Sequence, residues 1–366
     1  MPKIRVLVVD DAVVIRRMLS EVVERDAALE LAGVAANGKI ALQKITQVNP
    51  DVVTLDIEMP EMNGIETLRA IRKAYPKLPV IMCSTLTERG AVATIEALSA
   101  GANDYVTKPA NVGGIVEGLK VMETELVPKI KALCARLLPD PAAETLRPAP
   151  TTTTAATPRR ITLATRTGPR GPVDALAIGT STGGPNALHD VFSHLPSGLD
   201  VPVFVVQHMP PLFTGMLAER LGKVGPVPFH EGAEGMLVEP GHAYLAPGGL
   251  HMEAKRDGAR VRLHLHEGPP ENSCRPAVDP LFRSLAPLYG PGLLAVVMTG
   301  MGQDGLRGCK HVRERGGEIL VQDEASSVVW GMPGYVAEAG LADAVVPLKL
   351  LPQEIHRRVR ERRRAA

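Results

Sequence analysis

Residues 4–11 read IRVLVVDD, an apolar, β-prone run that ends in the acidic pair Asp10 and Asp11. A short run of this kind predicts a buried strand with two carboxylates directly after it. Residues 12–25 follow with apolar side chains at helical spacing. Strands that alternate with helices predict an α/β fold, in which helices cover both faces of a parallel sheet. Further strand-like runs lie at 34–36, 51–55, 80–83 and 105–106.

Polar residues follow several of these runs, at the point where each strand would end. In an open parallel sheet, ligands bind beyond the carboxyl ends of the strands. The predicted fold would therefore bring residues that are far apart in the sequence into one crevice. These residues are Asp10, Asp11, Asp56, Ser84 and Lys108.

The three aspartates of this crevice predict a Mg²⁺ site, because a cation offsets their repulsion and Mg²⁺ prefers oxygen ligands. With the metal in place, Asp56 could attack a phosphoryl group as a nucleophile. Lys108 would supply a positive charge to a phosphoryl oxygen, the hydroxyl of Ser84 could follow the phosphoryl group, and Tyr105 could swing with it. A single aspartate would more simply be a helix N-cap, so the hypothesis depends on these residues occurring together.

The motifs that carry these residues resemble the receiver domains of two-component response regulators over about the first 125 residues. The resemblance implies a flavodoxin-like, doubly wound parallel sheet, Asp56 as the phospho-acceptor, and a histidine kinase as the phosphodonor. It also implies that Asp10, Asp11 and Asp56 hold Mg²⁺ with help from the backbone of Glu58. The motifs are VVDD at 8–11, TLDIEMPEMNGIE at 54–66, CST at 83–85 and DYVTKP at 104–109.

The composition fits a protein with two packed cores, because 45% of the 366 residues are hydrophobic. The net charge of +1 gives no global field that favours nucleic acid or an acidic membrane. The four cysteines form no CxxC pair, which argues against a zinc site and fits a reducing compartment. The start is not a signal peptide, and no apolar run reaches the ~18 residues of a membrane span. We therefore expect a cytoplasmic protein without nucleic-acid binding or membrane insertion.

A Pro- and Thr-rich stretch from Pro139 to Pro172 shows no apolar periodicity and predicts an extended linker. A strand-like run resumes directly after it, and the final residues HRRVRERRRAA are strongly basic. We expect four segments. They are a first domain at 1–125, a linker at 126–172 with a helical start, a second domain at 173–355 and a basic tail at 356–366.

The second domain again places polar loops after strand-like runs, which lie at 174–179, 203–206 and 293–298. The three loops contribute Ser181, His208 and Asp304, one residue each. The first loop, GTSTG at 179–183, matches G-x-S-x-G, in which a serine lies on a tight turn between a strand and a helix. Taken alone, Ser181 could be a helix N-cap, or the glycine-rich loop could hold a phosphate.

Together, the three residues suggest a hydrolase. The imidazole of His208 could remove the Ser181 proton and return it to the leaving group, and Asp304 could fix the His208 tautomer. The backbone N–H of Met301 could help to form an oxyanion hole. A lone histidine is more often a buried, hydrogen-bonded residue, and Asp304 could be an N-cap. The order Ser, His, Asp also differs from that of the α/β-hydrolases.

Five segments of the second domain resemble the catalytic domain of the bacterial chemotaxis protein-glutamate methylesterases. With the receiver and linker, the resemblance spans nearly all of residues 1–355. It implies a Rossmann-like, mostly parallel α/β domain in which Ser181 is the nucleophile, His208 the general base and acid, and Asp304 the orienting acid. It also implies that the Met301 backbone donates to the oxyanion. The segments are IGTSTGGPNAL, VQHMPPLFTGMLAERL, ENSCRPAVDPLFRSLA, VVMTGMGQDG and VVWGMPGYVAEAGLAD.

By this resemblance, the substrates are methyl-esterified glutamate side chains of methyl-accepting chemoreceptors, and receptor glutamines are possible substrates for deamidation. The esterase reaction needs no cofactor, and the receiver inhibits it until Asp56 is phosphorylated by the chemotaxis histidine kinase. Three alternatives stay open: a transcriptional regulator with a DNA-binding output, a catalytically dead interaction module, and a nucleotide-binding domain. The length of the second domain argues against the first, and the absence of a P-loop lysine argues against the third.

Overall fold

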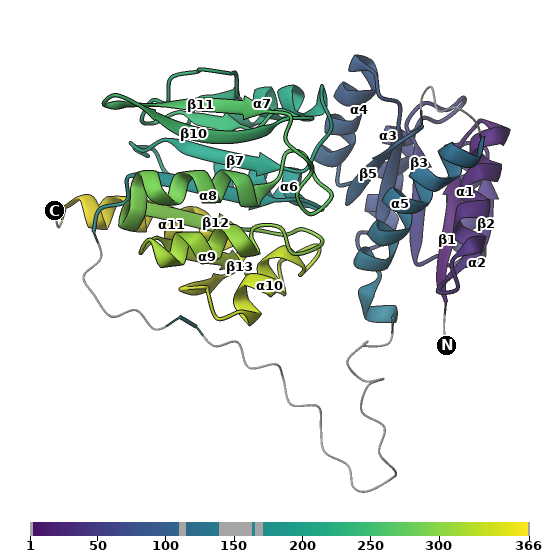
Figure 1. Ribbon diagram of the computed structural model, residues 1–366. Coiled ribbons are helices and arrows are strands. Elements are labelled where there is room, and N and C mark those ends of the chain that lie inside the picture. The colour runs from purple at the N-terminus through teal and green to yellow at the C-terminus, as the bar shows by residue number, and fades with distance from the viewer. Residues whose placement is uncertain (1–2, 110–114, 139–162, 165–170, 365–366) are drawn as a thin grey trace, which may run out of the picture. The chain divides into compact units, whose positions relative to one another are not determined.

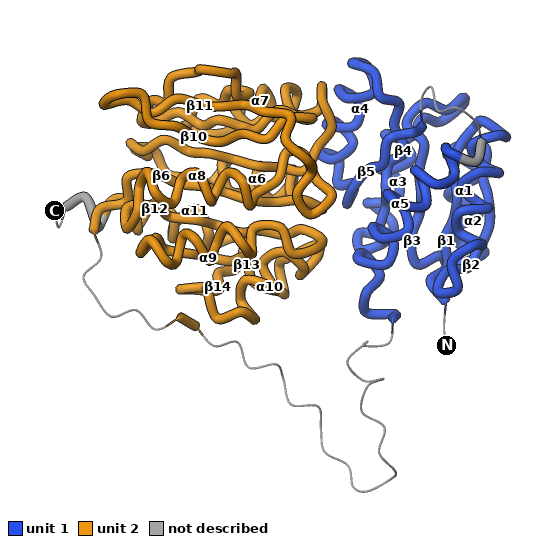
Figure 2. Tube along the Cα trace, viewed as in Figure 1, with its two compact units in different colours: residues 1–160 blue, residues 161–366 orange. Residues whose placement is uncertain are grey.

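The computed structural model describes residues 3–109, 115–138, 163–164 and 171–364. The chain divides into two compact units, residues 1–160 and 161–366, and each is described by itself (Figure 2). The division falls within the expected linker at 126–172, most of which lies outside the described residues.

Unit 1 is a five-stranded parallel sheet with the strand order β2-β1-β3-β4-β5 (Figure 1). Helices α1 and α5 pack together on one face, and α2, α3 and α4 follow one another on the other. The strands are β1 (Ile4–Val9), β2 (Leu29–Ala35), β3 (Val52–Asp56), β4 (Val80–Ser84) and β5 (Asp104–Thr107). The helices are α1 (Val13–Arg25), α2 (Gly38–Val48), α3 (Gly64–Ala74), α4 (Glu88–Ser99) and α5 (Ile115–Leu133), with a 3₁₀ turn η1 (Ala135–Leu137).

Strand β1 lies inside the sheet of unit 1, between β2 and β3. Strand β1 is almost entirely buried, and Ile4, Val6 and Val8 join the core under α1 and α5. Strand order reverses at β1, which pairs with β2 on one side and β3 on the other. This is the topological switch point at which doubly wound sheets bind ligands. The predicted doubly wound parallel sheet is therefore confirmed.

Unit 2 contains a seven-stranded sheet in which all neighbours are parallel, in the order β14-β13-β12-β6-β7-β9-β8. A separate antiparallel hairpin consists of β10 and β11. The strands are β6 (Ala175–Thr180), β7 (Val203–Gln207), β8 (Phe229–Glu231), β9 (Ala243–Leu245), β10 (His251–Asp257), β11 (Arg260–His266), β12 (Leu293–Val297), β13 (Glu318–Gln322) and β14 (Ala344–Val346).

Helices cover both faces of this sheet. Helices α8, α9 and α10 contact one another or neighbouring strands on one face, and α6, α7 and α11 lie on the other (Figure 1). The helices are α6 (Gly184–Ser193), α7 (Phe213–Gly222), α8 (Val278–Tyr289), α9 (Leu306–Glu314), α10 (Met332–Glu338) and α11 (Leu351–Arg364), with 3₁₀ turns η3 (Gly290–Gly292) and η4 (Leu348–Leu350).

The three strand-like runs expected at 174–179, 203–206 and 293–298 are β6, β7 and β12, with ends shifted by one residue at most. They are neighbours at the centre of the sheet, in the order β12-β6-β7. Because parallel strands end at the same edge, their three polar loops meet there. The predicted α/β domain with a mostly parallel sheet is confirmed.

The basic segment expected at 356–366 continues helix α11, which begins at Leu351 and runs to Arg364. Within it, Arg358 is only 5% exposed and pairs with Glu318 of β13 and with Glu354 one turn earlier. This part of the helix is therefore anchored to the unit by a buried ion pair. No helix in the described part of the chain is both long enough and apolar enough to cross a membrane.

Candidate functional site

The predicted phosphorylation crevice forms at the switch point of unit 1. Asp10 and Asp11 follow β1, and Asp56 is the last residue of β3, the strand beside it. Their carboxylate oxygens lie within 4.8 Å of one another. Lys108 follows β5, and its Nζ lies 2.8 Å from Asp10 Oδ2 and 2.7 Å from Asp56 Oδ1. The structure thus brings together four of the five residues that the sequence placed in the crevice, and the fifth, Ser84, lines the same pocket of about 210 Å³.

The charged groups of this crevice shift one another's pKa values. Burial raises the pKa of Asp56, the nearby Lys108 opposes that effect, and the net result is a pKa of about 6. For Lys108, burial lowers the pKa, but its hydrogen bonds to Asp10 and Asp56 outweigh burial and raise it. Lys108 is therefore held as a cation, but its charge does not fully offset the burial of the negative Asp56 carboxylate. A hard cation would add the missing positive charge, and three carboxylates are a suitable donor set for Mg²⁺.

Of the three residues expected to respond to the phosphoryl group, Ser84 and Lys108 line the crevice and Tyr105 does not. Ser84 ends β4, and its hydroxyl donates to the Gly90 carbonyl at 3.1 Å. The Lys108 backbone N–H donates to the Ser84 carbonyl at 2.7 Å, so the two residues lie side by side. Tyr105 is 5% exposed, does not line the pocket, and has the ammonium of Lys129 5.1 Å from its ring centroid. Tyr105 is thus in a buried position in this structure.

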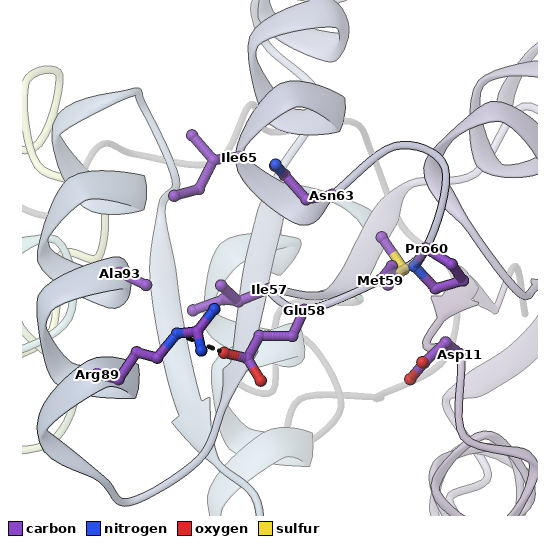
Figure 3. A pocket seen from close by; sticks show the side chains of 9 residues that line it. All are labelled: Asp11, Ile57, Glu58, Met59, Pro60, Asn63, Ile65, Arg89 and Ala93. Carbon is purple, nitrogen blue, oxygen red and sulfur yellow. Dashed lines mark ion pairs between the residues drawn. The ribbon is translucent and has the colours of Figure 1, made fainter.

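A larger hollow of about 550 Å³ adjoins the crevice and shares Asp11, Ile57 and Glu58 with it. Arg89 of α4 points toward Glu58 and forms an ion pair of 3.2 Å with it (Figure 3). The remaining lining residues come from the loop after β3 and from α3 and α4. They are Met59, Pro60, Asn63, Ile65 and Ala93.

Ser181 lies on the turn between β6 and α6, in unit 2. Its backbone N–H donates to the Thr299 carbonyl after β12, and its carbonyl accepts from the N–H of Gly184, the first residue of α6. A side chain at Gly184 would not fit, because its Cβ would lie 2.0 Å from Oε1 of Gln207. The glycine therefore lets the start of α6 approach β7 closely, and Ser181 sits beside the positive end of the helix dipole.

Gln207, the last residue of β7, connects the serine loop to the histidine loop. It is buried, and its amide Nε2 donates to the carbonyls of both Ser181 and His208. The His208 backbone N–H in turn donates to the Thr180 carbonyl at 3.2 Å. These hydrogen bonds hold the backbone segments of Ser181 and His208 next to each other. Sequence reasoning did not single out Gln207, although it immediately precedes His208 at the end of a buried strand.

His208 and Asp304 are in direct contact. The His208 Nε2 lies 2.7 Å from Asp304 Oδ2, and the side chains are 11% and 1% exposed. Burial alone lowers the pKa of His208, but hydrogen bonds to Asp304 and Cys274 outweigh burial and raise it to about 10. Because Nε2 faces Asp304, a serine proton would have to be accepted by Nδ1. Among the described residues, no hydrogen bond joins the Ser181 hydroxyl to His208 in this structure.

The Asp304 carboxylate lies at the N-terminus of α8 and accepts five hydrogen bonds. Burial raises its pKa, but the bonds from His208 and the backbone N–H groups of Val278 and Asp279 outweigh burial and lower it. The carboxylate is therefore held ionised, in part by the backbone N–H groups at the start of α8. The donors are His208 Nε2, Asn272 Nδ2 and the backbone N–H groups of Val278, Asp279 and Gly305.

Met301 has a 36% exposed side chain. Among the described residues, its backbone N–H has no hydrogen-bond acceptor. The preceding Gly300 packs on the serine, since a Cβ there would lie 2.8 Å from Ser181 Cβ. The Met301 N–H is thus an available donor on the residue that follows the contact of Gly300 with Ser181.

Both domains of the chain match known families. The family model described as "CheB methylesterase" matches residues 176–355, and the model described as "Response regulator receiver domain" matches residues 6–120. The protein-glutamate methylesterase/protein-glutamine glutaminase of Trichodesmium erythraeum is 49% identical, over 98% of this chain and 100% of that protein. The chain belongs to the CheB methylesterase family.

A second member of this family with the same name, from Nocardioides sp., is 52% identical over 99% of this chain and 97% of its own length. The solved Thermotoga maritima CheB methylesterase catalytic domain is 38% identical, covers 50% of this chain and 97% of that chain, and gives a TM-score of 0.49. The two nearly full-length relatives and the two family models confirm the family resemblance that the motifs indicated for both domains.

Proposed function

We propose that the chain hydrolyses methyl-esterified glutamate side chains of chemoreceptors, with Ser181 as the nucleophile. The relatives that match along nearly the full length of the chain are named protein-glutamate methylesterase/protein-glutamine glutaminase. The observation that supports the assignment of residues most strongly is the buried contact of His208 with Asp304 beside the Ser181 turn. An ester hydrolase of the serine type needs this pairing of base and orienting acid.

In the proposed reaction, Ser181 Oγ attacks the ester carbonyl while His208 Nδ1 accepts its proton. Asp304 accepts the hydrogen bond from Nε2 and stabilises the imidazolium that forms, which agrees with the raised pKa of His208. The imidazolium then protonates the leaving methoxide, and methanol departs. Water attacks the acyl-enzyme by the reverse proton transfers and restores a free glutamate carboxylate.

The negative charge on the carbonyl oxygen needs donors in the transition state. The Met301 backbone N–H supports this role because it has no acceptor among the described residues. The N-terminus of α6, which starts three residues after Ser181, adds a favourable dipole.

Deamidation of glutamine would use the same site. An amide has the same carbonyl geometry as a methyl ester and passes through the same acyl-enzyme, with ammonia as the leaving group. The relatives carry both activities in their names, and we propose both for this chain.

In the receiver domain we propose Asp56 as the phospho-acceptor. Asp10, Asp11 and Asp56 would hold Mg²⁺, which neutralises charge on the incoming phosphoryl group. Lys108 lies within 2.8 Å of two of these carboxylates and would pair with a phosphoryl oxygen. The Ser84 hydroxyl and the buried Tyr105 would respond to it. A receiver domain implies a kinase as phosphodonor, and we propose the chemotaxis histidine kinase.

We further propose that the unphosphorylated receiver inhibits the esterase. A switch of this kind requires that the phosphoryl group favours the active arrangement over the inhibited one, and each tenfold shift needs about 1.4 kcal/mol of preference. In this switch, the receiver would span residues 1–125 and the catalytic domain residues 173–355. Residues 126–172 would link the two domains, and residues 356–366 would form a basic tail.

Methanol release from methylated receptor membranes tests the esterase proposal. We expect release by the wild-type chain, near-complete loss in Ser181→Ala, and no loss in Ser193→Ala, a control at the other end of α6. Release that survives in Ser181→Ala would contradict the assigned nucleophile. A wild-type chain that releases no methanol from any methylated receptor would favour a catalytically dead module.

A further inference from the structure

The loop before α8 has an unusual backbone. Asn272 and Ser273 are consecutive non-glycine residues with left-handed φ values of 51° and 63°. Glu271 and Cys274 close the turn by exchanging two backbone hydrogen bonds of 3.1 and 2.9 Å. Left-handed backbone at non-glycine residues is unfavourable and occurs often at functional sites. Asparagine tolerates a left-handed backbone better than most residues do, and the Asn272 side chain forms specific hydrogen bonds.

The Asn272 side chain bridges two buried carboxylates. Its Nδ2 donates to Asp304 Oδ1 at 2.9 Å and to Asp279 Oδ2 at 3.0 Å. Asp279 and Asp304 are 0% and 1% exposed. An amide nitrogen carries two hydrogens, so both are used and both point at negative groups. The orientation of the amide is thereby determined, with nitrogen toward the carboxylates.

The second carboxylate is itself fixed. Asp279 Oδ1 accepts from the Gly308 N–H at 2.7 Å, which ties the first turn of α8 to α9. Burial raises the pKa of Asp279, and the charge of Asp304 raises it further. The two acids therefore repel each other across the Asn272 amide, which is a donor shared between them. Nothing in the direct Ser181–His208–Asp304 chemistry requires Asp279 or Asn272.

We propose that Asn272 is a positioning residue for the esterase, which orients the Asp304 carboxylate toward His208 and screens it from the charge of Asp279. This inference rests on the proposed function. The Asn272 amide acts on Asp304 Oδ1, while His208 contacts Oδ2 of the same carboxylate. The amide therefore acts on the imidazole only through the Asp304 carboxylate and does not contact it.

Loss of this donor has a predictable direction. With one hydrogen bond fewer, the Asp304 carboxylate is a stronger base and holds the His208 imidazolium more tightly. Because His208 must be neutral to accept the serine proton, the acidic limb of the kcat/KM profile should move to higher pH. The titratable and charged groups around Asn272, Asp279 and Asp304 include His208, Cys274, Cys309 of α9 and the ion pair of Glu271 with Arg283.

The test uses the full-length chain and methanol release from methylated receptor membranes across a pH series. Asn272→Gly removes the amide but suits a left-handed backbone, and Asn272→Asp keeps the shape but replaces the donor with a third carboxylate. Ser273→Gly is the matched control, because it relaxes the neighbouring left-handed residue, whose side chain is exposed. Ser181→Ala reports separately on the proposed function.

We expect a roughly 10- to 100-fold lower kcat for Asn272→Gly, the range for loss of a hydrogen bond to a charged group. KM should change little, the acidic limb should move up in pH, and Ser273→Gly should match wild type. Wild-type kcat in Asn272→Gly would overturn the inference. So would a lower kcat in both Asn272 variants with an unshifted pH profile, because that result indicates a structural role only. If Ser181→Ala remained active, the proposed function itself would fail, independently of Asn272.

Discussion

Replacing the phospho-acceptor Asp56 with asparagine should make the receiver more stable at neutral pH. Asp56 is buried, and its pKa is raised from 3.8 to about 6. The folded receiver therefore binds more protons than the unfolded chain between these two values, so its stability falls as pH rises through that window. Two pKa units correspond to about 3 kcal/mol. The asparagine side chain carries no charge at any pH, so the variant should recover up to about 3 kcal/mol above pH 6.

The assay is urea unfolding of a fragment of residues 1–138, which spans the described part of unit 1, in metal-free buffer. Metal must be absent because a bound cation would stabilise the wild type by mass action. We expect the gain of the Asp56→Asn fragment to be greatest above pH 6 and to shrink toward pH 4, where Asp56 is protonated in wild type. Glu24→Gln, on the exposed side of α1, should show no such trend. An Asp56→Asn fragment less stable than wild type at pH 7 would contradict the raised pKa of Asp56.

Three further predictions concern unit 2. Cys274→Ala removes one of the contacts that raise the pKa of His208, so the acidic limb of the pH profile of kcat/KM should move to lower pH. An unchanged pH profile would contradict a contact between Cys274 and His208. Gly300→Ala would place a Cβ 2.8 Å from Ser181 Cβ and 2.4 Å from the sulfur of the buried Met332, so methanol release should fall at least tenfold. Release at the wild-type rate would contradict the close packing. Arg358→Met leaves a buried carboxylate uncompensated and should destabilise a 161–366 fragment by about 3 kcal/mol or more in urea, and an unchanged midpoint would show that the pair contributes nothing.

The sequence predicted the central strands because buried parallel strands are continuous apolar runs. Strands β1, β6, β7 and β12 are of this kind, and each was expected within one residue of its observed ends. The outer elements carry no such signal. Strand β11 reads RVRLHLH and alternates charged with apolar residues, and β8 and β9 have only three residues each. Only residues 34–36 were expected for β2, in which Leu29 and Ala35 alone are buried.

The sequence also indicated which residues meet at each site, because parallel strands end at one edge. It placed Asp10, Asp56 and Lys108 together, and the structure joins them by contacts of 2.8 Å or less. It could not show which ring nitrogen of His208 faces Asp304, since that depends on side-chain rotation. The support of Asp304 by α8 and by Asn272 was also missed, because it comes from a loop whose left-handed residues leave no periodic pattern.

We propose that phosphorylation of Asp56 controls hydrolysis at Ser181. The most direct test of this control is the rate of methanol release from methylated receptor membranes by the full-length wild type and by Asp56→Asn, each with and without a small phosphodonor and Mg²⁺. If Asp56 is the phospho-acceptor, the phosphodonor should accelerate the wild type and leave Asp56→Asn at its basal rate. Equal acceleration of both proteins, or of neither while Ser181-dependent release persists, would contradict control through Asp56.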